Sequence, residues 1–107
     1  MKLTIILSTN NTETNWNAFR LANLALAKGD MVSIFLIGEG VEYGQTSSSK
    51  FNIKELAEKF LSSEKAQIIA CGTCLILRQQ KSSRECPTGG IEDLYGLVAD
   101  CDKVITF

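Results

Sequence analysis

Residues 66–78 read AQIIACGTCLILR, and the other elements of the chain are predicted relative to this stretch. An apolar run ends in Cys71, Gly72 interrupts it, and helix-compatible residues follow as far as Arg78. This pattern predicts a buried parallel strand that carries Cys71 to its carboxyl end, just before a short helix. Ligands bind at that edge of an open α/β sheet. Because a helix N-terminus favours negative charge, we expect a lowered pKa and thiolate character at Cys71.

Strand-like and helix-like segments alternate along the rest of the chain. The patterns predict strands at 2–8, 31–37, 66–70 and 103–107, and helices at 12–28, at 53–62 and from residue 91 onward. Residues 79–90 are expected to form a loop, and a fifth short strand remains open near 75–80, where strand and helix patterns compete. The alternation predicts one α/β domain over residues 1–107. Helices should cover both faces of a parallel sheet of four to five strands, in three α/β/α layers.

Three of these helices carry further signals. Asn10 and Asn52 each stand three residues before a glutamate, a spacing typical of a helix start. The last helix carries an apolar stripe that we expect to face the core, formed by Ile91, Leu94, Tyr95, Val98 and Cys101.

Composition excludes several kinds of chemistry. The chain of 107 residues has 11 basic and 12 acidic side chains and no histidine. The lack of histidine excludes Cys–His and Ser–His–Asp mechanisms, and any histidine-containing metal site made by one chain. No basic block is present, which argues against nucleic acid or an anionic membrane as a partner.

The N-terminal apolar run is too short for the apolar region of a signal peptide, and no stretch is long enough to span a membrane. We therefore expect a reducing, cytoplasmic location, where the four cysteines are catalytic, metal-binding or buried rather than a disulfide framework.

Residues 38–44 read GEGVEYG and partly match a dinucleotide-binding fingerprint. Tyr43 stands where the third glycine is required, and no helix opens directly after it. We interpret the segment as a flexible glycine-rich turn followed by a serine-rich linker.

The four cysteines follow the spacing C-x2-C-x11-C-x14-C, which lacks the second short-spaced pair of a structural zinc site. We therefore expect no metal and no cofactor. Cys71 is the candidate nucleophile or sulfur acceptor, and its alternative role is that of a buried core cysteine. Cys74 completes a Cys-x-x-Cys motif and is either a redox partner of Cys71 or a side chain facing the core. Cys86 is a loop cysteine able to act as a resolving thiol, and Cys101 is expected in the core.

Five further residues are candidates for a pocket around these thiols. Arg78 either stabilises a thiolate or anion or is a solvated helix charge. Asn10 and Glu13 follow the first predicted strand and lie at the same sheet edge as Cys71. Gly72 and Thr73 complete the cysteine turn.

Several blocks of the chain, taken together, resemble the DsrE/DsrF-like proteins. They are residues 10–13, 16–22, 28–38, 70–74 and 99–107, which include ACGTC at 70–74 and DKVITF at 102–107. The CGTC block with an arginine after it, and the DKVITF ending, are the most specific of these. The resemblance extends over nearly the whole chain.

The resemblance implies a flavodoxin-like three-layer sheet of about five strands. It also implies homotrimers or homohexamers, with the cysteine near a subunit interface. Family members in sulfur relays carry a persulfide on one cysteine between donor and acceptor proteins, in tRNA thiolation or sulfur oxidation. That cysteine ends the third strand, seven residues before an arginine, and matches Cys71. Relatives commonly have Arg-Gly where this chain has Arg78-Gln79.

Three functions follow as hypotheses. The first is a sulfur carrier or sulfurtransferase-like protein with Cys71 as acceptor and Cys74 as a resolving or auxiliary thiol. The second is an oligomeric binding module whose cysteines are structural. The third is a dithiol oxidoreductase that uses Cys71 and Cys74.

Overall fold

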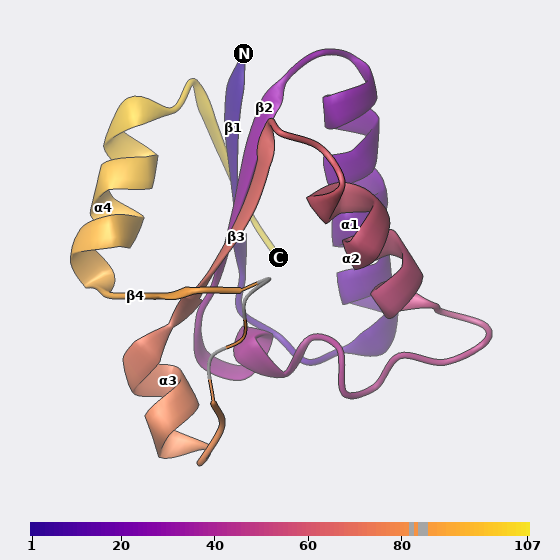
Figure 1. The fold of residues 1–107 in the computed structure, drawn as a ribbon, viewed down its shortest axis with the longest axis vertical. Helices are drawn as coiled ribbons and strands as arrows, with labels where there is room; N and C mark the ends of the chain where they lie inside the picture. The colour runs from indigo at the N-terminus through magenta and orange to yellow at the C-terminus, as the bar shows by residue number, and fades with distance from the viewer. Residues whose placement is uncertain (82, 84–85) are drawn as a thin grey trace.

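A parallel five-stranded sheet in the order β4-β3-β2-β1-β5 forms the middle layer of the protein (Figure 1). The computed structural model describes residues 1–81, 83 and 86–107. The elements are β1 (Lys2–Leu7), α1 (Thr12–Ala27), β2 (Met31–Leu36), the 3-10 helix η1 (Gly38–Glu42), α2 (Ile53–Leu61), β3 (Ala66–Cys71), α3 (Gly72–Leu77), β4 (Thr88–Gly89), α4 (Ile91–Asp100) and β5 (Lys103–Thr106). The three-layer α/β/α class and the four predicted strands are confirmed.

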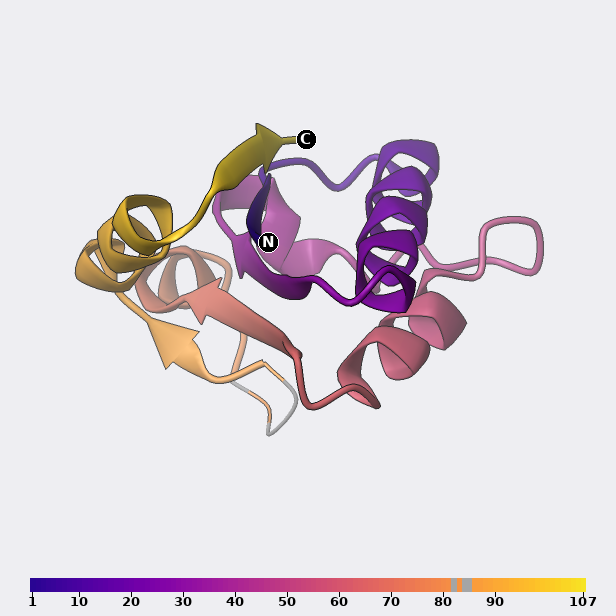
Figure 2. The same ribbon diagram turned by 90° about the horizontal axis from the view of Figure 1, so that it is seen from above.

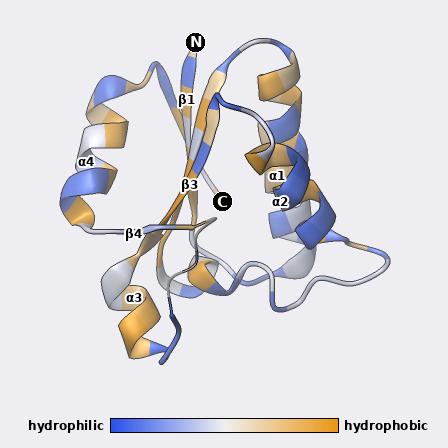
Figure 3. Cartoon of the chain, in the orientation of Figure 1, coloured by the Kyte–Doolittle hydropathy of each residue, from blue (hydrophilic) through white to orange (hydrophobic). Residues whose placement is uncertain are grey.

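Helices α1 and α2 cover one face of the sheet, and α4 lies over the opposite face (Figures 1 and 2). Alternate residues of the three central strands point toward α1 and α2, as the two-residue period of a strand requires. The main core lies in this layer and includes Leu3, Ile5, Leu7, Val32, Ile34, Leu36, Ile68, Phe19, Ala22, Ile53 and Phe60. Figure 3 shows the apolar colouring of the strands that this core requires.

The two helices of this layer begin at asparagine caps. The Asn52 side chain accepts the Glu55 N–H, as the sequence predicts for α2. For α1 the predicted cap was one residue early, because Asn11 rather than Asn10 accepts the Thr14 N–H at 2.9 Å. A capping oxygen reaches an N–H two or three residues ahead, and helix α1 begins at Thr12.

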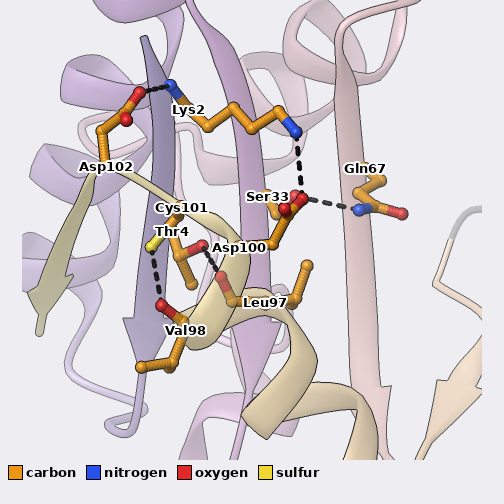
Figure 4. Close-up of polar contacts among 9 residues, drawn as sticks. All are labelled: Lys2, Thr4, Ser33, Gln67, Leu97, Val98, Asp100, Cys101 and Asp102. Atoms are coloured by element: carbon orange, nitrogen blue, oxygen red, sulfur yellow. Dashed lines mark hydrogen bonds and ion pairs between the residues drawn. The ribbon is translucent and has the colours of Figure 1, made fainter.

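The face beneath α4 carries a row of polar side chains. Thr4, Ser33 and Gln67 are register partners across β1, β2 and β3. The Thr4 hydroxyl donates to the Leu97 carbonyl, and the Gln67 amide donates to the Ser33 hydroxyl (Figure 4). A hollow of about 120 Å³ lies between this row and the C-terminal half of α4.

The prediction that an apolar stripe of the last helix faces the core is therefore wrong for Ile91, Tyr95 and Val98, whereas Leu94 and Cys101 are partly buried. No residue of α4 is buried, and Ile91, Tyr95 and Val98 are 64%, 76% and 42% exposed. The helix contacts the sheet partly through polar groups, because the row beneath its C-terminal half offers hydroxyls and an amide.

The fifth strand is not at 75–80. Those residues form the end of α3 and the turn after it, where Leu75 is buried and Ile76 is exposed. The fifth strand is β4, within the predicted loop 79–90, and it pairs with Ala70 and Cys71. Residues 82, 84 and 85 of that loop lie outside the described part of the chain.

The glycine-rich segment after β2 is a 3-10 helix rather than a flexible turn. A Cβ atom at Gly40 would overlap the Leu7 carbonyl oxygen, so only glycine lets η1 lie against the end of β1. Gly38 has a φ of 57°, a left-handed conformation that glycine adopts without strain.

Candidate functional site

Cys71 occupies two structural positions at once. It is the last residue of β3 and the N-cap of α3, with its side chain accepting the Cys74 N–H at 3.4 Å. Leu75, which is buried, anchors α3 to the core one turn later. The predicted placement at the carboxyl edge of the sheet is thus confirmed, and both Cys71 and Cys74 are partly buried.

A second backbone group reaches the thiol pair from β2. The register places Leu36 opposite Ala70, so the residues that follow these two strands meet at the sheet edge. There the Gly38 N–H donates to the Cys74 sulfur at 3.2 Å. Each sulfur of the Cys-x-x-Cys motif therefore accepts one backbone N–H, and the free thiols lie next to each other.

The expected lowered pKa of Cys71 is contradicted. Burial raises the pKa of the Cys71 thiol, and the neighbouring Cys74 thiol raises it further. The backbone N–H groups of Cys74 and Thr73 act in the opposite direction but are outweighed. Removing a thiolate from water disfavours the charged form, and α3 has only six residues with which to compensate.

Arg78 lies beside the thiol pair but is directed elsewhere. Its Nε donates to Glu42 Oε1 at 3.2 Å, and its Nη1 donates to the Cys74 carbonyl at 3.3 Å. Both ion-pair partners are about a quarter exposed, with side-chain values of 28% and 25%. The guanidinium thus ties α3 to η1, and its predicted role toward a thiolate or anion stays a prediction.

The other four pocket candidates fall into two groups. Gly72 and Thr73 form the turn between the two thiols, and the Thr73 N–H acts on the Cys71 sulfur. Asn10 and Glu13 follow β1, and among the described residues neither has a hydrogen bond to the thiol pair. The Asn10 carbonyl accepts from the Thr46 hydroxyl, and the Glu13 carbonyl accepts from the Asn17 amide.

Of the remaining cysteines, Cys86 is buried in the core, and Cys101, which was expected there, is only partly buried. Cys86 is buried at 7% exposure in the main core, with its sulfur 3.4 Å from the Tyr43 hydroxyl. Cys101 caps the end of α4 and is only partly buried, with its thiol donating to the Val98 carbonyl (Figure 4). Cys86 thus packs in the core although it belongs to a loop, whereas Cys101 does not because α4 stands off the sheet.

A second cleft, larger than the hollow beneath α4, has neither Cys71 nor Cys74 in its lining. It has a volume of about 370 Å³ between η1 and α2, and its lining includes Glu42, Tyr43, Gln45, Lys54 and Glu58. Glu42 therefore links the cleft to Arg78 and, through it, to α3.

Within residues 1–81, 83 and 86–107, no three cysteine, aspartate or glutamate side chains are grouped to hold a metal ion. Over the same residues, none of the helices has the length and apolarity needed to cross a membrane.

Sequence reasoning missed Gly38 and Glu42 as parts of the site. A signal for Gly38 was present, because it directly follows the predicted strand 31–37 and so reaches the same sheet edge as Cys71. No local signal marks Glu42, which meets Arg78 across 36 positions of sequence.

Comparisons with known proteins agree with this architecture. The model of the DsrE/DsrF-like family matches residues 1–107. The uncharacterized protein MK0008 of Methanopyrus kandleri is 35% identical over 103 residues, covering 89% of this chain and 83% of that protein. The crystal structure of the YchN protein from E. coli superposes with a TM-score of 0.83 over the whole of both chains, at 22% identity. The chain therefore belongs to the DsrE/DsrF-like family.

Proposed function

We propose that this protein is a sulfur carrier that takes up sulfur as a persulfide on Cys71 and relays it to a partner protein. The observation that carries this proposal is the position of Cys71. The residue ends β3 at the carboxyl edge of a parallel sheet, where open α/β sheets bind ligands. Family membership supports it, because the DsrE/DsrF-like resemblance implies a sulfur relay.

Uptake requires one exchange reaction. The Cys71 thiolate attacks the outer sulfur of a donor persulfide, a new sulfur–sulfur bond forms on Cys71, and the donor cysteine leaves as a thiolate. No histidine base is needed, which suits a chain that has none. Because burial raises the pKa of Cys71, only a small thiolate fraction exists at neutral pH.

Intact-mass measurement tests the proposal directly. The reduced protein is incubated with a small-molecule hydropersulfide and measured under native conditions, beside Cys71→Ser. We expect the native chain to acquire sulfur from the donor and the variant to remain unchanged. Failure of both the native chain and Cys74→Ser to acquire sulfur, together with a Cys71 that iodoacetamide does not alkylate in the reduced protein before the donor is added, would favour a binding module with structural cysteines.

A dithiol oxidoreductase is the second candidate, favoured by the contact between the Cys74 N–H and the Cys71 sulfur. The two functions differ in their dependence on Cys74. If the protein is a carrier, the Cys74→Ser variant still takes up sulfur. If it is a dithiol reductase, the same variant loses turnover.

We also propose that copies of this chain assemble through α4. Ile91, Tyr95 and Val98 present apolar surface to water, while the sheet below the helix offers polar groups. A second copy that covers these side chains would remove apolar area from water. The family resemblance supports a trimer or hexamer, with sulfur donor and acceptor proteins as further partners.

A further inference from the structure

We infer that Cys74 discharges the persulfide of Cys71 within the same chain, releasing hydrosulfide and leaving a Cys71–Cys74 disulfide. This inference rests on the proposed function, because it begins from a loaded Cys71. It adds a second reaction to the carrier and a product, free hydrosulfide, that needs no acceptor protein.

The first support is the environment of the Cys74 sulfur. The Gly38 N–H donates to it at 3.2 Å from a different element, the start of η1. This hydrogen bond holds the Cys74 sulfur at the carboxyl edge of the sheet, where β3 delivers Cys71.

The second support is the contact between the two cysteines. The Cys74 N–H lies 3.4 Å from the Cys71 sulfur, so the turn from β3 into α3 folds the two residues against each other. Residues three apart on a helical turn have neighbouring side chains. The Cys74 sulfur is therefore within a short movement of the inner sulfur of a persulfide on Cys71.

The third support is the way Arg78 fixes the position of Cys74. Its guanidinium donates to Glu42 and to the Cys74 carbonyl. Among the described residues, Glu42 is the acidic side chain that forms an ion pair with Arg78. The cation thus fixes α3 against η1 and keeps Cys74 next to Gly38.

The reaction balances without an added reagent. The Cys74 thiolate attacks the inner sulfur of Cys71–S–SH, the bond between the two cysteine sulfurs forms, and the bond to the outer sulfur breaks. The outer sulfur takes the bonding electron pair and leaves as HS⁻ with the proton that it already carries. It is reduced, and the Cys74 sulfur is oxidised. An external dithiol reductant then supplies two electrons and two protons to restore both thiols.

The test follows sulfur on the protein and in solution. Reduced protein is loaded anaerobically with inorganic polysulfide, the donor is removed, and intact mass and released sulfide are followed over time. The samples are the native chain, Cys74→Ser, Cys71→Ser and Cys101→Ser. The last is a matched control, since Cys101 lies at the end of α4, away from the thiol pair. Circular dichroism and a Cys74→Ala variant establish that the Cys74 variants are folded.

We expect the native chain and Cys101→Ser to end two hydrogen atoms lighter than the reduced chain, with one sulfide released per disulfide. Cys74→Ser should instead keep its extra sulfur atom at least about tenfold longer. Cys71→Ser should neither load nor release sulfide.

Equal persulfide lifetimes in the native chain and Cys74→Ser would overturn the inference and leave the carrier function intact. Sulfur loading on Cys74 of Cys71→Ser, located by peptide mass mapping, would overturn it as well, since Cys74 would then be an acceptor rather than a discharging thiol. If no sample acquires sulfur or forms the disulfide, both the carrier function and the discharge reaction are wrong.

Discussion

At the scale of the residue, the chemistry depends on the protonation of Cys71. Burial raises the pKa of this thiol, so the neutral form dominates at neutral pH. We expect its rate of alkylation by iodoacetamide to rise about tenfold per pH unit between about pH 7 and 8.5, because the thiolate fraction rises by that factor below the pKa. Peptide mass mapping of the native chain beside Cys71→Ser assigns the rate to this residue. A plateau within that range would show that the thiol is more acidic than its surroundings predict.

The raised pKa of Cys71 also makes the free energy of unfolding depend on pH. An unfolded chain releases the Cys71 proton at a lower pH than the folded chain does, so the contribution of Cys71 to stability is complete below the unfolded pKa. It is lost as the pH rises toward the folded pKa. The sulfur chemistry and the stability of the fold therefore respond to alkaline pH in opposite directions.

At the scale of the element, α4 is the helix least supported by the core. Gly96 lies in its middle, and a Cβ atom there would meet nothing within 4 Å. We expect Gly96→Ala to raise the free energy of unfolding by up to about 1 kcal/mol, because alanine has less backbone freedom to lose and a higher helix propensity. Urea denaturation followed by circular dichroism measures the change.

Gly40→Ala is the matched control for that substitution. Its Cβ would overlap the Leu7 carbonyl, so the same exchange should lower stability by about 2 kcal/mol or more. If Gly96→Ala also lowers stability, the space around Gly96 in the folded protein is not open, and the packing of α4 described above is wrong.

At the scale of the whole molecule, the exposed face of α4 predicts the state of assembly. We expect light scattering at about 50 µM, a concentration at which stable oligomers persist, to give a mass several times that of one chain. Tyr95→Arg should reduce that mass, since the side chain is 76% exposed and would place a charge within the apolar contact.

Leu24→Arg provides the comparison, because Leu24 is 54% exposed but lies on α1, across the sheet from α4. Its mass should match that of the native chain. A native chain that is monomeric would disprove the assembly, and equal masses for the native chain and Tyr95→Arg would place the contact elsewhere.

Local patterns predicted most of the fold. Apolar runs located β1, β2 and β3, since buried parallel strands need side chains that suit both faces of a sheet. A shorter apolar run also located β5, although this edge strand is exposed. The break at Gly72 placed Cys71 at the carboxyl edge and Cys74 one turn beyond it. These features depend on residues that are neighbours in sequence, which is why the sequence alone determined them.

Contacts between distant segments decided the rest. Helix α4 accepts a hydrogen bond at Leu97 from Thr4, which belongs to a polar row with Ser33 and Gln67 that only the strand register brings together. The raised pKa of Cys71 depends on how the fold excludes water, and the stretch around Cys71 had favoured the opposite shift. The Gly38 N–H meets the Cys74 sulfur across 36 residues. The sequence thus determined the elements and the position of the thiols, whereas the tertiary structure decided their solvation and hydrogen bonding, because both are set by neighbours in space.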